Sequence, residues 1–138
     1  MLYRCPADKS TEFVDWDDPC SVARREELRW ASFATNGLMD CALTDPNYKP
    51  RFPCHVIWVA EAPDHAVGSL HFHPENWGWG EDPNNNIAYS RHGRQSNYLF
   101  VDGHVAEMTL IDTWDPNRVN LWHPAHAPAW WHLGMDLF

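Results

Sequence analysis

The sequence predicts an α+β fold with a small antiparallel sheet, one short helix and long irregular loops. The dipeptide Asp102-Gly103 separates the apolar runs NYLFV and HVAEM, and Asp-Gly in that setting favours a two-residue hairpin turn. The run HVIWVA at His55–Ala60 has the β-branched and aromatic composition of a buried strand. The 11 prolines and 7 glycines among 138 residues indicate a chain rich in loops.

The first half of the chain contributes the short helix. The segment Asp15–Glu27 fits a turn followed by this helix, because Asp18 can cap it and Pro19 suits its first position. The next run, Leu28–Ala34, fits either the end of the helix or a strand. Three prolines in Asp45–Pro53 predict a loop there.

The second half contributes a weaker strand at Val67–Phe72, a long loop at His73–Ile87 and the hairpin. In a two-residue turn, Leu99 faces Ala106 across the hairpin. One face of the hairpin is then apolar and needs a cover; it comprises Leu99, Val101, Ala106, Met108 and Leu110. We expect either that the tail His123–Phe138 folds over this face or that the domain self-associates through it.

Length and charge set the class of protein. We expect a single soluble domain, residues 1–138, with a head over 1–110 and an irregular tail rich in Trp, His and Pro over 111–138. Ten Lys and Arg against 19 Asp and Glu give a net charge of −9, which repels phosphate backbones and argues against nucleic acid as a partner. The longest apolar runs fall far short of the roughly 18 residues of a membrane helix. No N-terminal stretch has the pattern of a signal peptide.

The four cysteines, Cys5, Cys20, Cys41 and Cys54, all lie in the first 54 residues and form no CxxC pair. Their even number suits two disulfides in an oxidising compartment, with three possible connectivities. Pairing of Cys5 with Cys20 and of Cys41 with Cys54 is favoured, because each closes a short loop. The alternative is four buried free thiols in a cytosolic protein.

Four segments in order resemble the prepilin-type processing-associated domain. The segment RHGRQSNYLFVDGHV contains the signature of this family, a His followed by nine residues and Asp-Gly, here His92 and Asp102-Gly103. Upstream, LYRCPADKS at Leu2–Ser10 resembles the family's F/Y-x-C-P-x-D segment. RWASFATNG at 29–37 resembles its Y-x-x-N strand, with Phe33 in the place of Tyr, and HVIWVAEA at 55–62 resembles its strand that ends in Glu.

The resemblance implies the head of a pilin-like or type II secretion pseudopilin-like protein, a structural subunit without catalytic residues. Members normally begin with a prepilin leader and a long apolar helix, which a prepilin peptidase processes, and this sequence shows neither. The expected partners are further copies or other pilin-like subunits of an envelope or extracellular filament. The expected location is extracytoplasmic, with membrane contact only through the missing N-terminal helix. We expect structural roles for the signature, with His92 closing a loop and Asp102 setting the hairpin turn.

A calcium site is the only cofactor prediction. The run GEDPNNN concentrates oxygen donors, which calcium prefers. The candidate ligands are Glu81, Asp82, Asn84 and Asn86. Major pseudopilins hold calcium in a loop of the head, so the resemblance favours this site, and a solvated turn is the alternative.

Two other functions remain open. The first is a secreted carbohydrate-binding or adhesive module that stacks polysaccharide on loop tryptophans, namely Trp77, Trp79, Trp122, Trp130 and Trp131. These indoles can instead form a hydrophobic core for the loop-rich half. The second is a zinc-dependent hydrolase that uses His71, His73 and His104 as ligands and Glu61 as base.

Overall fold

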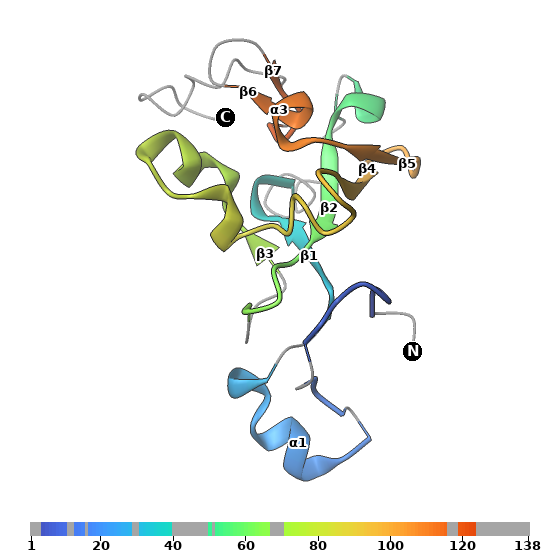
Figure 1. The fold of residues 1–138 in the computed structure, drawn as a ribbon, viewed down its shortest axis with the longest axis vertical. Helices are drawn as coiled ribbons and strands as arrows, with labels where there is room; N and C mark the ends of the chain where they lie inside the picture. The colour runs from blue at the N-terminus through green and yellow to red at the C-terminus, as the bar shows by residue number, and fades with distance from the viewer. Residues whose placement is uncertain are drawn as a thin grey trace.

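The computed structural model describes residues 4–10, 13–15, 17–28, 31–39, 50, 52–66, 71–115 and 119–123. Figure 1 shows a body that contains the sheet and, at the far end of the long axis, a lobe that carries helix α1 (Pro19–Ala23). Among the described residues, no helix is long and apolar enough to cross a membrane. The predicted α+β class is confirmed.

Five strands form the main sheet in the order β3-β1-β2-β4-β5. Their bounds are Phe33–Asn36 (β1), Ile57–Glu61 (β2), His71–Phe72 (β3), Ser96–Phe100 (β4) and Val105–Met108 (β5). The prediction of an antiparallel sheet holds for β1, β2, β4 and β5, but the short strand β3 runs parallel to β1, so the sheet is mixed.

Short elements flank the sheet. They are the 3-10 helices η1 (Arg25–Glu27), η2 (Pro53–His55), η3 (Pro74–Trp79) and η4 (Pro83–Asn85), helix α3 (Leu110–Thr113), and the strand pair β6 (Trp114–Asp115) and β7 (Val119–Asn120). As expected, Asp18 caps α1 by accepting a hydrogen bond from the backbone of Cys20, and Pro19 occupies the first turn. Thr109 and Asp112 form a capping box at α3.

The β4–β5 hairpin differs from the prediction by one residue. Leu99 pairs with Val105 rather than with Ala106. The backbone of Phe100 bonds to both Gly103 and His104, so three residues rather than two form the loop. Gly103 has a φ of +94°, the left-handed position that closes a three-residue hairpin loop.

This shift changes which side chains face the core, because neighbouring strand residues point to opposite faces. Tyr98 and Phe100 are buried and share their face with Ala106 and Met108. The predicted apolar face of Leu99, Val101, Ala106, Met108 and Leu110 is therefore wrong in part. Leu99 lies on the opposite face, in register with Val59 and Val105.

Aromatic rings cover the Tyr98 face of the sheet. Trp122 is fully buried and packs edge-on against Phe72, Trp77 and Tyr98, with ring centroids 5.2–5.6 Å apart. Trp77 is also buried and stacks on Phe72. The prediction that Trp77 and Trp122 are binding residues is therefore wrong, because their faces are occupied by core packing. The Trp79 side chain, together with Trp130 and Trp131, lies outside what the structure describes.

Asn36 ties β1 to the segment that carries Trp122. Its side-chain amide donates hydrogen bonds to the carbonyls of Ile57 (3.0 Å) and Trp122 (2.6 Å), and Ile57 in turn bonds to Leu121. The cover therefore comes from residues 119–122, which precede the predicted tail His123–Phe138, and of that tail the structure describes His123 alone.

Candidate functional site

A polar cluster of Cys5, Glu61 and His92 lies where the N-terminal segment meets the end of the sheet. His92 Nε2 lies 2.9 Å from Glu61 Oε1 and 3.7 Å from Cys5 Sγ. One ligand atom from each residue lies within 4.8 Å of the other two. Thiol, imidazole and carboxylate are also the groups that bind transition metals.

Glu61 sits at the end of β2, and its side chain is 1% exposed. Ser96 Oγ donates to Glu61 Oε2 over 2.5 Å, and Ser96 itself begins β4 beside β2. Burial opposes ionisation of the Glu61 carboxyl, but hydrogen bonds from Ser96, His92 and Cys5 hold its pKa below the ordinary value. The carboxylate is therefore a buried negative charge with several donors.

His92 is held by a tight turn before β4. Its backbone N–H donates to the carbonyl of Gln95 at 3.0 Å, and Gly93 supplies the positive φ of +80° within this turn. His92 thus closes a loop, as expected from the sequence. Its side chain is 28% exposed, so the cluster opens to solvent on the imidazole side.

Cys5 is fixed to the strand region by its own backbone. Its N–H donates to Ser32 Oγ at 2.8 Å, and Ser32 O accepts from the backbone of Ala62, just beyond β2. Burial raises the pKa of the Cys5 thiol, and the Glu61 carboxylate adds to this effect. Cys5 is therefore a protonated thiol near neutral pH and not an activated nucleophile.

The arrangement does not match a nucleophilic triad. In such a triad, the imidazole contacts the nucleophile through one ring nitrogen and its carboxylate through the other. Here Cys5 Sγ and Glu61 Oε1 both approach Nε2 of His92. The cluster can hold a proton or a metal ion at one point, but it is not arranged to relay a proton from thiol to carboxylate.

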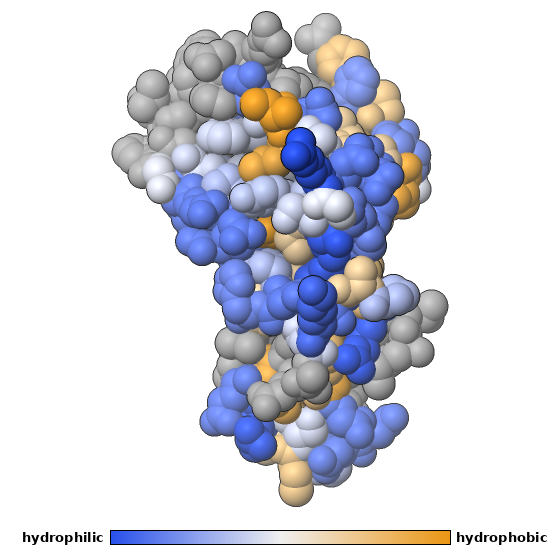
Figure 2. Space-filling model, in the orientation of Figure 1, coloured by the Kyte–Doolittle hydropathy of each residue, from blue (hydrophilic) through white to orange (hydrophobic). Residues whose placement is uncertain are grey.

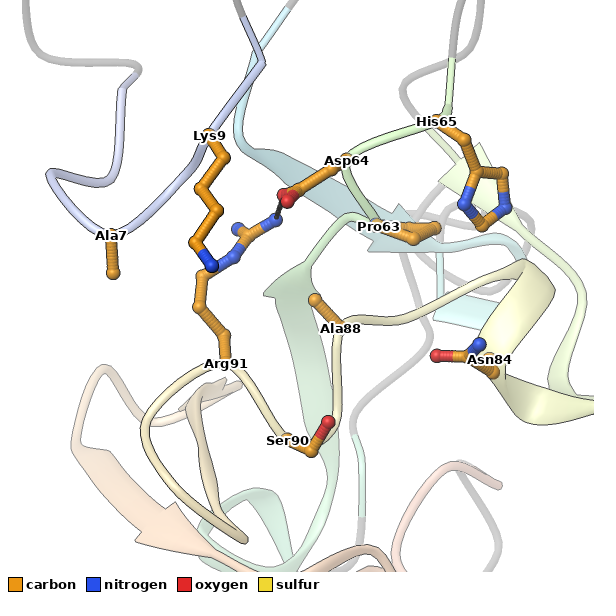
Figure 3. A pocket seen from close by; sticks show the side chains of 9 residues that line it. All are labelled: Ala7, Lys9, Pro63, Asp64, His65, Asn84, Ala88, Ser90 and Arg91. Atoms are coloured by element: carbon orange, nitrogen blue, oxygen red, sulfur yellow. Dashed lines mark hydrogen bonds and ion pairs between the residues drawn. The ribbon is translucent and has the colours of Figure 1, made fainter.

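Arg91 joins the same junction from the adjacent position. Its side chain is 4% exposed, and its Nη2 donates to the carbonyl of Ala62 (2.8 Å), pairs with Asp64 and lies 3.7 Å from Asp8. Figure 3 shows the guanidinium reaching toward Asp64 at a cavity of about 320 Å³. The polar residues that line this cavity include Lys9, Asp64, His65, Asn84, Ser90 and Arg91.

The predicted disulfide between Cys5 and Cys20 is not formed. Both are free thiols, because Cys5 is buried against the sheet, whereas Cys20 is exposed on α1 in the separate lobe (Figure 1). Cys54 is an exposed free thiol, and Cys41 lies outside the described residues.

The predicted zinc-hydrolase set is not brought together. The His71 and His73 rings lie 5.3 Å apart at β3, at one edge of the sheet. His104 lies in the hairpin at the opposite edge, where its ring stacks on Phe100 and its Nδ1 lies 2.6 Å from Asp102 Oδ1. Glu61 is engaged with His92 instead.

The predicted calcium ligands are used mostly within their own loop. Asp82 caps η4 by accepting from the backbone of Asn84. Asn86 Oδ1 accepts the indole N–H of Trp77 at 2.7 Å, and its Nδ2 donates to Glu81 Oε1 at 3.0 Å. The Asn86 amide N–H donates to Glu81, whereas a cation site would require an oxygen in that place. This arrangement therefore favours a hydrogen-bonded turn over a calcium site.

The signature residues fall in two different places. His92 belongs to the buried cluster, whereas Asp102 is in the hairpin loop, where its carboxylate accepts from the backbone of His104 at 3.1 Å. That bond and the hydrogen bond to the His104 imidazole hold the Asp102 pKa below its ordinary value. Asp102 and Gly103 therefore shape the turn and do not join the cluster.

Sequence reasoning did not assemble Cys5, Glu61 and His92 into one site. One signal was available: a Glu that ends a buried apolar strand requires partners, because an unpaired buried carboxylate is costly.

Comparison with protein-family models, with curated proteins and with solved structures found no match.

Proposed function

We propose that this protein is the head of a pilin-like or pseudopilin-like subunit, with a structural role in an extracytoplasmic filament or secretion system. Its partners are further copies or related subunits. This role requires a rigid head whose outer surface contacts neighbours, and it requires no catalytic residue.

The observation that supports this proposal is that all four segments resembling the prepilin-type domain meet at one junction. The first supplies Cys5 and Asp8, the second Ser32, the third Glu61 and the fourth His92 with Arg91. Every one of these side chains binds another segment. Residues used in this way fasten the N-terminal segment to the sheet, which is a structural task.

The surface near β5 offers a contact area for a neighbouring subunit. Val105 on this edge strand is 63% exposed and Ile111 on α3 is 65% exposed, both unusually high for aliphatic side chains. Figure 2 shows orange atoms at the right-hand edge, at the level of the β4–β5 hairpin of Figure 1, and a separate group of orange atoms at the level of α3. Exposed apolar positions beside a sheet edge are typical of interaction surfaces.

Charge placed on this surface tests the proposal. We expect Val105→Glu combined with Ile111→Glu to reduce self-association or incorporation into the filament at least tenfold, measured by sedimentation of the assembled fraction. Because both side chains are exposed, the melting temperature should change little. Ala23→Glu, which adds a charge at an exposed position of the α1 lobe, is the matched control and should assemble normally. Equal assembly of both charged proteins would contradict the proposed contact surface.

A further inference from the structure

We propose that Cys5, Glu61 and His92 form a binding site for one divalent transition-metal ion, with zinc as the best fit. The site lies between the N-terminal segment and the ends of β2 and β4. It is independent of the proposed assembly role, which needs no metal.

The distances fit zinc coordination. With zinc–sulfur bonds of about 2.3 Å, bonds to nitrogen and oxygen of about 2.0 Å and tetrahedral angles, sulfur and nitrogen ligands lie about 3.5 Å apart and nitrogen and oxygen about 3.3 Å. Cys5 Sγ and His92 Nε2 are 3.7 Å apart, and Nε2 and Glu61 Oε1 are 2.9 Å apart. The imidazole–carboxylate pair must separate slightly, which the partly exposed His92 ring on its turn allows. The third pair, Cys5 Sγ and a Glu61 oxygen, lies within 4.8 Å.

The convergence of two groups on one nitrogen also favours a shared ion. A neutral imidazole Nε2 offers either one proton or one lone pair, so it serves one partner at a time. Cys5 Sγ and Glu61 Oε1 nevertheless both lie against it. An ion placed among the three atoms would satisfy all of them at once, with the remaining ring proton on Nδ1.

Charge balance supports a divalent ion. Glu61 contributes one negative charge, and binding replaces the S–H bond of Cys5 with a metal–sulfur bond and releases that proton to solvent. The two negative ligands then neutralise the two positive charges of the ion in a largely buried site. Ser96, which donates to the free oxygen of Glu61, holds the carboxylate in place as outer-shell partners of metal ligands do.

The donor set selects the metal. Calcium and magnesium prefer oxygen ligands, whereas thiolate and imidazole suit zinc and related transition metals. Three protein ligands leave the fourth tetrahedral position to water, and the partial exposure of His92 provides the path for entry.

The test is titration of the chelator-treated full chain with Zn²⁺ by calorimetry, and with Co²⁺ by absorption spectroscopy. We expect one Zn²⁺ per chain, a melting temperature that rises with zinc concentration, and a thiolate-to-cobalt charge-transfer band. His92→Gln keeps an amide near the Nε2 position for Glu61 but lowers the affinity at least 100-fold, and Cys5→Ser abolishes the cobalt band. Ser96→Ala weakens binding about 10–100-fold.

The controls are Cys20→Ser with Cys54→Ser, which removes two exposed thiols, and His104→Gln, which removes an imidazole outside the cluster. Both should bind zinc normally. A measurement on the unmutated chain keeps the test valid if a variant fails to fold. In this measurement, alkylation of each cysteine is mapped by mass spectrometry, and zinc should slow alkylation of Cys5 but not of Cys20 or Cys54. Absence of zinc uptake, or a cobalt band that persists in Cys5→Ser, would overturn the proposal.

Discussion

Tyr98 lies fully buried in the centre of the sheet, with its ring 5.6 Å from that of Trp122. Among the described residues, its hydroxyl is buried without a hydrogen-bond partner. Burial, together with the negative charges of Glu61 and Asp112, raises the Tyr98 pKa far above its ordinary value. The hydroxyl therefore stays neutral and contributes no hydrogen bond within the described chain.

We therefore expect Tyr98→Phe to leave the free energy of unfolding unchanged or to raise it by up to about 1 kcal/mol, because the buried hydroxyl has no partner among the described residues. Tyr98→Ala, which removes the ring as well, should cost about 3–5 kcal/mol. Chemical denaturation of the two variants separates the ring from the hydroxyl. A loss above 1 kcal/mol in Tyr98→Phe would show that the hydroxyl has a partner.

At this scale the sequence predicted contacts within a few residues better than contacts between distant segments. The loop-closing role of His92 and the cap formed by Asp18 follow from local patterns, because both depend on backbone within a few residues. Contact between Cys5 and His92 joins residues 87 positions apart, and no local pattern encodes it. For the same reason, the sequence favours pairing of Cys5 with the nearby Cys20, which the structure does not form.

Among the elements, the β4–β5 hairpin shows how one additional loop residue changes which side chains face the core. The Asp-Gly pair predicted a turn at the right place, but a two-residue loop and a three-residue loop place opposite sets of side chains on the core. The burial of Tyr98 and Phe100 beside Trp122 favours the three-residue form, in which these large rings reach the core. The length of the loop therefore depends on tertiary packing and cannot be predicted from the turn sequence alone.

Replacement of Gly103 tests this loop. Gly103→Val should destabilise the protein by about 1–3 kcal/mol, because Val resists a φ of +94°. An added Cβ meets nothing within 4 Å, so the cost is conformational and not steric. Gly103→Asn should cost less, since Asn tolerates the left-handed region. Equal melting temperatures for the Val variant and the natural protein would contradict the loop assignment.

For the other strands, too, the sequence predicted the position of each strand better than its pairing. The strand predicted at His55–Ala60 is β2 (Ile57–Glu61), which begins later because His55 ends the 3-10 helix η2 (Pro53–His55). Of the weaker strand at Val67–Phe72, the structure describes β3 at its last two residues. The parallel pairing of β3 with β1 was not predicted, because pairing between distant segments leaves no periodic signal in either one.

In the molecule as a whole, two junctions fasten distant parts of the chain to the sheet. Asn36 holds the Trp122 segment against β1 and β2, and the Cys5–Glu61–His92 cluster with Arg91 and Asp8 holds the N-terminal segment. The lobe with α1 extends away from the sheet (Figure 1). Such a head, held together at two junctions and with Val105 exposed on the edge strand β5, is consistent with the proposed subunit that packs against neighbours.

The central proposal is that this protein is a subunit of an extracytoplasmic assembly. The most direct measurement is immunogold electron microscopy of the cells that produce it, with antibodies against the purified chain, alongside fractionation into sheared-surface, envelope and cytosolic material. The account predicts label on surface or envelope filaments and enrichment in the sheared-surface or envelope fraction. Diffuse label in the cytoplasm, with the protein recovered in the cytosolic fraction, would contradict it.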